Sequence, residues 1–215
     1  MNNLHLATIA ILAANIIVSF KGFNDSHFFE RYKFGIGPIK SGQKERLFTS
    51  GFLHVDVSHL IFNMLTLYFF ANVVISYFGP IKFLLIYGIS LAAGSLLALF
   101  FHKDEPYYSA VGASGAVTGI LYSAILLQPN MMLGLMFIIP IPAYIFGIGY
   151  LLYSIYGMKN KVGNIGHTAH FGGAIGGYST TLLFAPNLLF TETLMVFLLA
   201  IPIVILFVLE KKGKL

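Results

Sequence analysis

The chain contains no cysteine among its 215 residues. Disulfides, thiolate metal sites and cysteine nucleophiles are therefore excluded. Charge is also scarce, because only 10% of the residues are charged and 57% are hydrophobic, whereas soluble domains average about 25% charged residues. This composition, with a mean hydropathy of +0.82, indicates an integral membrane protein.

The sequence lacks a clustered basic face and a set of metal ligands, which disfavours nucleic-acid binding and metal chemistry. The net charge of +5 comes from basic residues in loops between apolar stretches, without the clustered basic face that phosphate contacts need. The histidines are accompanied by neither an H-E-x-x-H sequence nor a third carboxylate or thiolate ligand, so we expect no metal and no other cofactor.

The eight acidic residues avoid the interiors of the long apolar stretches. They lie in loops or at the ends of those stretches: Asp25, Glu30, Glu45, Asp56, Asp104, Glu105, Glu192 and Glu210. Ion-coupled transporters usually place carboxylates near the membrane midplane, so a small transporter is the less favoured alternative.

Long apolar stretches predict the fold. A spanning helix needs about 20 mostly apolar residues, and seven stretches approach that length: 4–20, 57–78, 80–101, 113–128, 133–157, 168–185 and 188–209. We therefore predict an all-α, polytopic membrane helical bundle in a single domain, 1–215. Because of Pro140 and Pro142, the fifth helix is expected to start near Pro142, with Met131–Ile139 at the membrane interface. The short fourth and sixth stretches are rich in small residues, which is typical of helices in a bundle interior.

The sequence Gly112-Ala113-Ser114-Gly115 stands at the start of the fourth stretch. A helix N-terminus presents free backbone N–H groups and a positive dipole end, which suit the stabilisation of an oxyanion. Gly112 and Gly115 permit a close approach of backbone or substrate. The pattern therefore indicates a nucleophilic serine, and the alternative is a capping serine in a glycine-rich helix interface.

His170 lies early in the sixth stretch, where Gly173, Ala174 and Gly177 share its helix face. An ionisable residue within a span is a functional hypothesis by default, and the alternative is an interfacial histidine that bonds a carbonyl. The topology puts Ser114 and His170 on the same side at similar depth, as a nucleophile and its general base require. Because the spans hold no acid, we predict a dyad and not a triad.

The second stretch carries polar residues at helical spacing. His59 and Asn63 are four residues apart and share a face, and His54 precedes them. Imidazole and amide N–H groups are the donors that a tetrahedral oxyanion needs. The alternative is a network of hydrogen bonds between helices that only fixes their packing.

Together these segments resemble the rhomboid family of intramembrane serine proteases over nearly the whole chain. The matching pieces are Arg46, Phe48–His54, His59–Asn63, Gly112–Gly115 and Ala169–Gly173, in that order. The resemblance implies a six-helix core, at about residues 1–185, plus one extra C-terminal span at about 188–209, seven transmembrane helices in all.

The resemblance also implies a reaction. The chain would be a serine endopeptidase that hydrolyses peptide bonds in or near transmembrane segments of single-pass or multi-pass membrane proteins within the lipid bilayer. Ser114 would be the nucleophile and His170 the general base, with His59, Asn63 and the Ser114 N–H as the oxyanion hole. The alternative is an inactive relative that binds transmembrane clients; such relatives would lack the serine or the histidine, and both are present here.

Three further positions receive structural roles from the resemblance. His54 would order the junction between the first loop and the second helix. Gly173 and Gly177 would let the sixth helix pack closely against the fourth.

Two departures from the family pattern concern how the site is supported. Glu45-Arg46 stands where the family often has Trp-Arg, in a chain without tryptophan, so the anchoring of the first loop is expected to differ. Thr118 stands four residues after Ser114, where an aromatic residue often stacks on the histidine. We therefore expect Phe171 or Tyr178 to help hold His170.

The sequence gives two opposed indications of orientation. Of the 13 Lys and Arg residues, 12 fall on the side of Ser114 and only Lys82 falls on the other, which the positive-inside rule assigns to the cytoplasm. The resemblance implies a site that faces away from the cytoplasm, in a prokaryotic-type cell membrane. We expect the orientation of the family.

Overall fold

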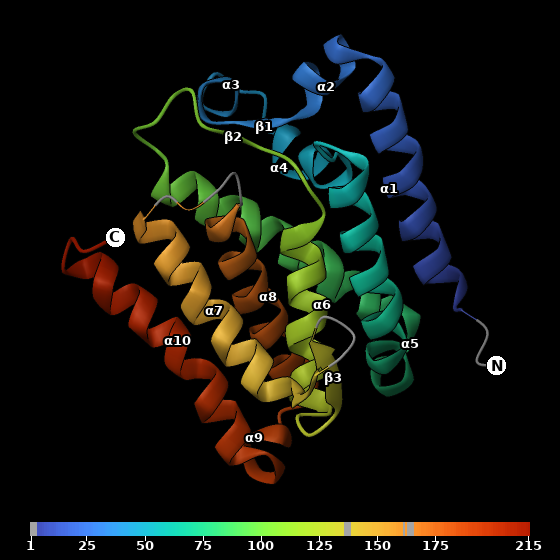
Figure 1. Ribbon diagram of the computed structural model, residues 1–215, viewed down its shortest axis with the longest axis vertical. Coiled ribbons are helices and arrows are strands. Elements are labelled where there is room, and N and C mark those ends of the chain that lie inside the picture. The colour runs from blue at the N-terminus through green and yellow to red at the C-terminus, as the bar shows by residue number, and fades with distance from the viewer. Residues whose placement is uncertain (1–3, 136–138, 161, 163–165) are drawn as a thin grey trace.

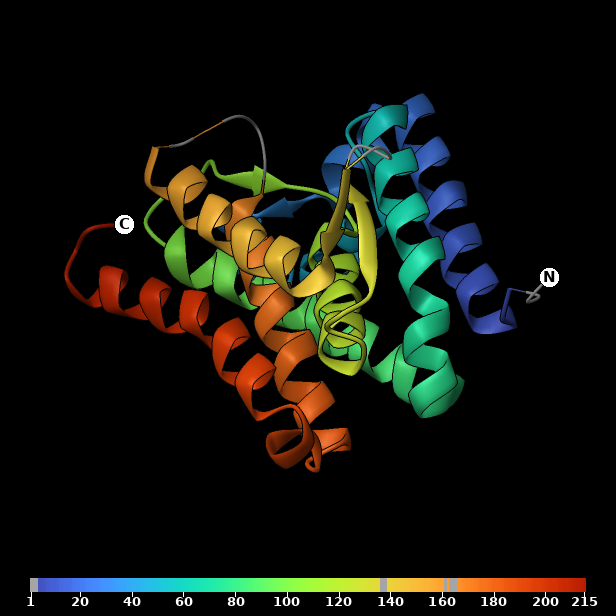
Figure 2. The ribbon, with the colours of Figure 1, turned by 60° about the horizontal axis from the view of Figure 1, so that its bottom comes forward.

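The computed structural model describes residues 4–135, 139–160, 162 and 166–215. It is a bundle of helices with two small β pairs (Figures 1 and 2). The main helices are α1 (Leu6–Asn24), α5 (Val57–Phe101), α6 (Ser114–Leu127), α7 (Ala143–Asn160), α8 (His167–Phe184) and α10 (Thr193–Lys211), with the short α9 (Leu188–Thr191) before α10. Among the described residues, α1, α5 and α10 are each long and apolar enough to cross a membrane. The protein is thus an all-α, polytopic membrane bundle, as the sequence predicts.

The long helix α5 contains two of the predicted spans. At Gly79 the backbone leaves helical geometry, with φ 76° and ψ 171°. Only glycine adopts this left-handed conformation at little cost, and the following Pro80 cannot continue the helical hydrogen bonds. The chain therefore turns back here, between the stretches 57–78 and 80–101.

The fifth apolar stretch is helical only in its second part, and its helix starts next to Pro142, as the sequence predicts. Strand β3 (Met132–Leu135) pairs antiparallel with β4 (Ile139–Pro142), and helix α7 begins only at Ala143. Proline lacks an N–H and forces the preceding residue towards extended geometry, so Pro140 and Pro142 favour a strand over a helix. Residues 136–138 lie outside the described residues, and the interfacial placement of Met131–Ile139 stays a prediction.

The first loop folds into short elements that reach the segment before Ser114. These elements are α2 (Ser26–Tyr32), β1 (Phe34–Gly35), α3 (Ile36–Lys40), α4 (Arg46–Thr49) and the 3₁₀ turn η1 (Ser50–Phe52). Strand β1 pairs antiparallel with β2 (Ser109–Ala110), so that Phe34 lies opposite Ala110. In Figure 1 these elements gather at the end of the bundle where α6 and α8 begin.

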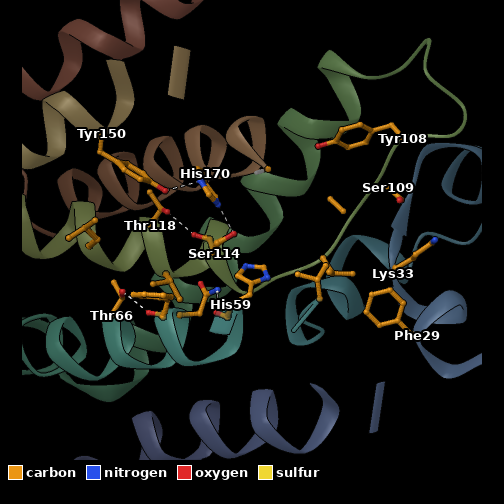
Figure 3. Close-up of a pocket in the computed structure, with 18 of the residues that line it drawn as sticks. Phe29, Lys33, His59, Thr66, Tyr108, Ser109, Ser114, Thr118, Tyr150 and His170 are labelled. Carbon is orange, nitrogen blue, oxygen red and sulfur yellow. Dashed lines mark hydrogen bonds between the residues drawn. The ribbon is translucent and has the colours of Figure 1, made fainter. Parts of the chain in front are cut away.

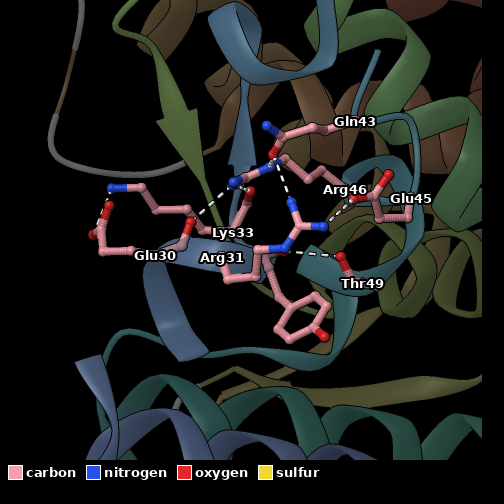
Figure 4. A network of polar contacts seen from close by, with 8 residues as sticks. Glu30, Arg31, Lys33, Gln43, Glu45, Arg46 and Thr49 are labelled. Carbon is pink, nitrogen blue, oxygen red and sulfur yellow. Dashed lines mark hydrogen bonds and ion pairs between the residues drawn. The ribbon is translucent and has the colours of Figure 1, made fainter. Parts of the chain in front are cut away.

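Arg46 anchors this loop in the absence of tryptophan. Its side chain is buried, and its Nε donates a hydrogen bond of 2.8 Å to Gln43 Oε1 (Figure 4). Its Nη1 donates bonds of 2.8 Å to the carbonyl oxygens of Glu30 and Lys33. One guanidinium thus ties α2 to the turn before α4, because its fork of fixed donors can bind several acceptors at once.

Helix α6 lies in the interior of the bundle between α5 and α8. Its residues from Gly115 to Leu127 are all buried. A Cβ atom added at Gly173 would overlap the carbonyl oxygen of Gly115, and one added at Gly177 would overlap that of Gly119. The backbones of α6 and α8 therefore touch, which brings their N-terminal ends together. Helix α10 packs against α7, and the division into a core of residues 1–185 and an extra span at 188–209 stays a prediction.

Candidate active site

Ser114 is the first residue of α6, and the turn before it is held from two sides. Gly112 has φ 133°, a left-handed conformation that favours glycine. Its N–H donates to the carbonyl of Ser50 at 3.0 Å, and the N–H of Ala113 reaches His54 Nε2 at 3.5 Å. Because the first turn of a helix leaves its N–H groups without helical partners, the Ser114 N–H can serve a ligand.

His170 lies in the first turn of α8 and meets Ser114 directly. Its Nε2 is 2.7 Å from Ser114 Oγ (Figure 3). The imidazole is 9% exposed, whereas the serine is partly open. The structure therefore brings together the two residues that the sequence assigned as nucleophile and base.

Tyr150 of α7 holds the far side of the imidazole. Its hydroxyl is 2.7 Å from His170 Nδ1, and the two rings stack with their centroids 5.9 Å apart and their planes 23° apart. The sequence reasoning missed this residue. The available signal was a phenol hydroxyl in an apolar span, which is costly unless it finds a partner.

The expectation that Phe171 or Tyr178 holds His170 is wrong. Phe171 is fully buried in the apolar cluster that includes Leu121. The Tyr178 hydroxyl donates a bond of 2.9 Å to the carbonyl of Val196 on α10. Phe171 follows His170 directly and therefore points to another face of α8. Tyr178 lies eight residues further on, about 12 Å along the helix axis from the imidazole.

Thr118 lies one turn after Ser114 on α6, and its side chain lies next to Ser114 and Tyr150. Its hydroxyl donates a bond of 2.7 Å to the Ser114 carbonyl, and its side chain lies close to the Tyr150 hydroxyl. Figure 3 shows Thr118 beside Tyr150 and above Ser114. Thr118 thus leaves the space over His170 to Tyr150.

His59 and Asn63 lie in the first two turns of α5, across from His170 on the other side of Ser114. The His59 N–H is capped by Asp56 Oδ1 at 2.7 Å. A Cβ added at Gly112 would lie 3.0 Å from His59 Nε2 and 3.5 Å from Ser114 Oγ, so both side chains border the same glycine. Asn63 Nδ2 donates one hydrogen bond, at 3.0 Å, to the His59 carbonyl, which leaves its second N–H for another acceptor.

His54 links α1 to the turn before Ser114. The Ser19 hydroxyl donates to the Phe52 carbonyl at 2.9 Å, so it accepts its 2.8 Å bond from the Nδ1–H of His54. Nε2 is then free to accept from the Ala113 N–H. Burial, with a smaller contribution from nearby His59, lowers the pKa of His54 to about 3, so the ring is neutral and structural.

A cavity of about 860 Å³ connects these groups to the loop end of the bundle. Its lining includes Ser114 and His170 together with Phe29, Lys33, Val117, Tyr108 and Leu121. Polar groups thus meet at one wall of a space that is otherwise largely apolar. Such a site can accept an extended apolar peptide and present its carbonyl to the serine.

Comparison with known proteins adds a family match and curated relatives. The family model "Rhomboid domain" matches residues 41–187. The chain is 32% identical over 181 residues to RHOMBOID-like protein 12, mitochondrial, of Arabidopsis thaliana, covering 77% of this chain and 54% of that protein. It is 36% identical over 140 residues to Rhomboid protease GluP of Bacillus subtilis, covering 65% and 26%. Rhomboid protein 1, mitochondrial, of Saccharomyces cerevisiae is 31% identical over 133 residues, covering 60% and 38%.

The chain spans about half or less of the length of these relatives. Two of the three are mitochondrial by name, so the expectation of a prokaryotic-type cell membrane is not borne out.

Proposed function

Because the chain belongs to the rhomboid family of multi-pass helical membrane proteins, we propose that it is an intramembrane serine endopeptidase. It hydrolyses peptide bonds in or near transmembrane segments of other membrane proteins. The observation that carries this proposal is the distance of 2.7 Å between Ser114 Oγ and His170 Nε2. A serine with a neutral imidazole at hydrogen-bond distance is an activated nucleophile.

The reaction divides into two steps. First, His170 Nε2 takes the proton of Ser114 while Oγ attacks the scissile carbonyl carbon, and the imidazolium then gives that proton to the departing amine. Second, a water molecule gives a proton to Nε2 and its oxygen attacks the acyl ester. The imidazolium then gives that proton to Ser114 Oγ as the ester bond breaks, which releases the acid and restores both residues. The cavity beside Ser114 gives water a route to a site inside the bundle.

The negative charge on the attacked oxygen needs fixed donors. We assign this role to the Ser114 N–H, His59 and Asn63. Support comes from the position of His59 Nε2 beside Gly112 and from the second N–H of Asn63, which has no acceptor among the described residues. Donors that are oriented before the reaction lower the barrier strongly in a site of low dielectric.

The substrate must present an extended backbone. In a helix each carbonyl is bonded within the chain and shielded by the following turn, so a transmembrane substrate has to unwind locally. We therefore expect small or helix-breaking residues near the scissile bond. A client-binding relative without activity is the alternative, and it is disfavoured because both Ser114 and His170 are present and in contact.

Cleavage of a reporter transmembrane substrate tests the proposal. We expect Ser114→Ala and His170→Ala each to lower the rate by about 10⁴-fold or more, as in other serine hydrolases. Ser123→Ala is the matched control, since Ser123 is buried on the same helix α6 away from the cavity. Undiminished cleavage by either site variant would overturn the proposal, as would failure of a serine-directed phosphonate to label the wild-type protein at Ser114.

We further propose that the site opens away from the cytoplasm, against the distribution of Lys and Arg. Because the chain has no cysteine, single cysteines introduced at Lys82 and Lys212 can be probed with an impermeant maleimide. Labelling of position 212, and not of position 82, from the extracytoplasmic side supports this orientation, and the reverse pattern contradicts it. Lys161, which contributes to the charge count, lies outside the described residues.

A further inference from the structure

His170 is flanked by hydroxyl groups, and no acid bonds to it among the described residues. Its Nδ1 lies 2.7 Å from the Tyr150 hydroxyl, and the Thr118 side chain lies beside that of Tyr150. The Thr118 hydroxyl in turn donates to the Ser114 carbonyl oxygen at 2.7 Å. Figure 3 marks the bonds at both ends of this series, from Tyr150 to His170 and from Thr118 to Ser114.

The carbonyl at the end of this series favours one direction for its hydrogen bonds. A carbonyl oxygen only accepts, so the Thr118 hydroxyl uses its single proton there. The Thr118 oxygen is then left as an acceptor for the neighbouring Tyr150 hydroxyl, and a Tyr150 hydroxyl that points its proton to Thr118 accepts from the Nδ1–H of His170. With its proton on Nδ1, the imidazole has a bare Nε2, which is the atom that lies 2.7 Å from Ser114 Oγ.

We infer that Tyr150 and Thr118 are positioning residues that hold His170 as the Nδ1–H tautomer with Nε2 towards Ser114. The inference rests on the proposed function, in which Nε2 is the base. In serine proteases with a triad, this task falls to an aspartate, and loss of the correct tautomer costs about 10⁴-fold in rate. Here neutral groups perform it, which suits a membrane interior where an unpaired carboxylate is costly.

This arrangement also explains why a threonine can stand at position 118, four residues after Ser114, where the family pattern often has an aromatic residue. The stacking ring comes from α7, and threonine in α6 connects its hydroxyl to Ser114. The three groups belong to α6, α7 and α8, so the tautomer is fixed only while these helices are packed together.

Steady-state cleavage by variants is the first test. Tyr150→Phe keeps the ring and removes the hydroxyl, and Thr118→Val removes the hydroxyl at equal size. Because a neutral hydrogen bond is worth roughly one factor of ten, we expect kcat to fall about tenfold in each, with KM little changed. Thr118→Ser retains the hydroxyl and should keep kcat within about twofold of the wild type.

Tyr156→Phe is the control, because Tyr156 lies on the same helix and is 57% exposed. An equal loss of kcat in this control would overturn the inference. So would a wild-type kcat in Tyr150→Phe, or an equal loss in Thr118→Ser and Thr118→Val.

Nitrogen NMR of ¹⁵N-histidine-labelled protein is the second test, and it needs no substrate. The His170 signals are identified by their loss in His170→Asn. We expect the Nδ1–H tautomer in the wild type and a mixture with Nε2–H in Tyr150→Phe. An Nε2–H tautomer in the wild type would refute the inference even if every variant folded poorly. Absence of any cleavage or phosphonate labelling would instead refute the proposed function, and the tautomer would still be measured.

Discussion

Replacement of Gly173 by alanine is the sharpest test of how helix packing supports the site. Gly173 lies on α8 one turn after His170, and a Cβ at this position would overlap the carbonyl oxygen of Gly115, the residue that follows Ser114. The three atoms nearest to this Cβ are all backbone atoms of Gly115. Backbone atoms cannot rotate away as a side chain does, so α6 and α8 must separate.

The size of the effect follows from this overlap. The Cβ would lie 1.9 Å from the Gly115 oxygen, whereas ordinary contact begins at 3.4 Å, so the helices must part by roughly 1.5 Å. Overpacking of a close-packed interior costs about 1–3 kcal/mol. For a protein of this size that lowers Tm by roughly 5 °C. A displacement of about 1 Å between reacting groups lowers the rate by roughly 100-fold. We therefore expect Gly173→Ala to lose far more activity than stability.

Two measurements on purified protein in detergent check this expectation: thermal unfolding, and initial rates on a reporter transmembrane substrate. Gly88→Ala on α5 is the matched control, because a Cβ there meets nothing within 4 Å. The control should keep its activity and gain up to about 1 kcal/mol, since alanine suits a helix interior better than glycine. Wild-type rate and Tm in Gly173→Ala would refute the argument that direct backbone contact sets the distance between Ser114 and His170.

Two further predictions concern the support of the site from the first loop. Arg46→Met should lower the free energy of unfolding by roughly 3 kcal/mol, because the partly buried carbonyls of Glu30 and Lys33 lose their charged donor. Thermal unfolding should show a much smaller loss in Arg31→Met, whose side chain is 53% exposed, and equal losses would contradict the anchoring role. For His54, burial lowers the pKa from 6.5 to about 3, so the unfolded chain binds the extra proton and stability falls as the pH drops from about 6.5 towards 3, by up to about 1.4 kcal/mol per pH unit. Thermal unfolding against pH should be less steep in His54→Asn, and an identical slope would contradict this assignment.

Much of the fold could be read from the sequence, because the membrane imposes simple rules. Apolar stretches of spanning length predict helices, since the backbone must satisfy its own hydrogen bonds in lipid. The stretches 57–78 and 80–101 follow in this way, with Gly79 between them. The start of α7 at Ala143 was signalled by Pro140 and Pro142, but the pairing of β3 with β4 was not, since strand pairing depends on contacts that no local pattern encodes.

Some residues of the candidate site could likewise be predicted from the sequence, and others could not. Polar residues within apolar spans are rare, and this allowed four site residues to be predicted: Ser114, His170, His59 and Asn63. Tyr150 could not be predicted, because one tyrosine among several on α7 reaches the imidazole only through the rotation of that helix about its axis. For the same reason the sequence favoured Phe171 and Tyr178, which are close to His170 along the chain and face other partners in space.

Hydropathy and residue spacing along the chain therefore suffice to establish a polytopic helical bundle and the polar residues that share one end of it. Both conclusions rest on local properties of the sequence. The contact of the α6 and α8 backbones at their glycines, and the rotation of α7 that turns the Tyr150 hydroxyl to His170 Nδ1, are visible only in the folded protein. Distances of a few ångströms between helices depend on how all their surfaces pack at once, which no single segment specifies.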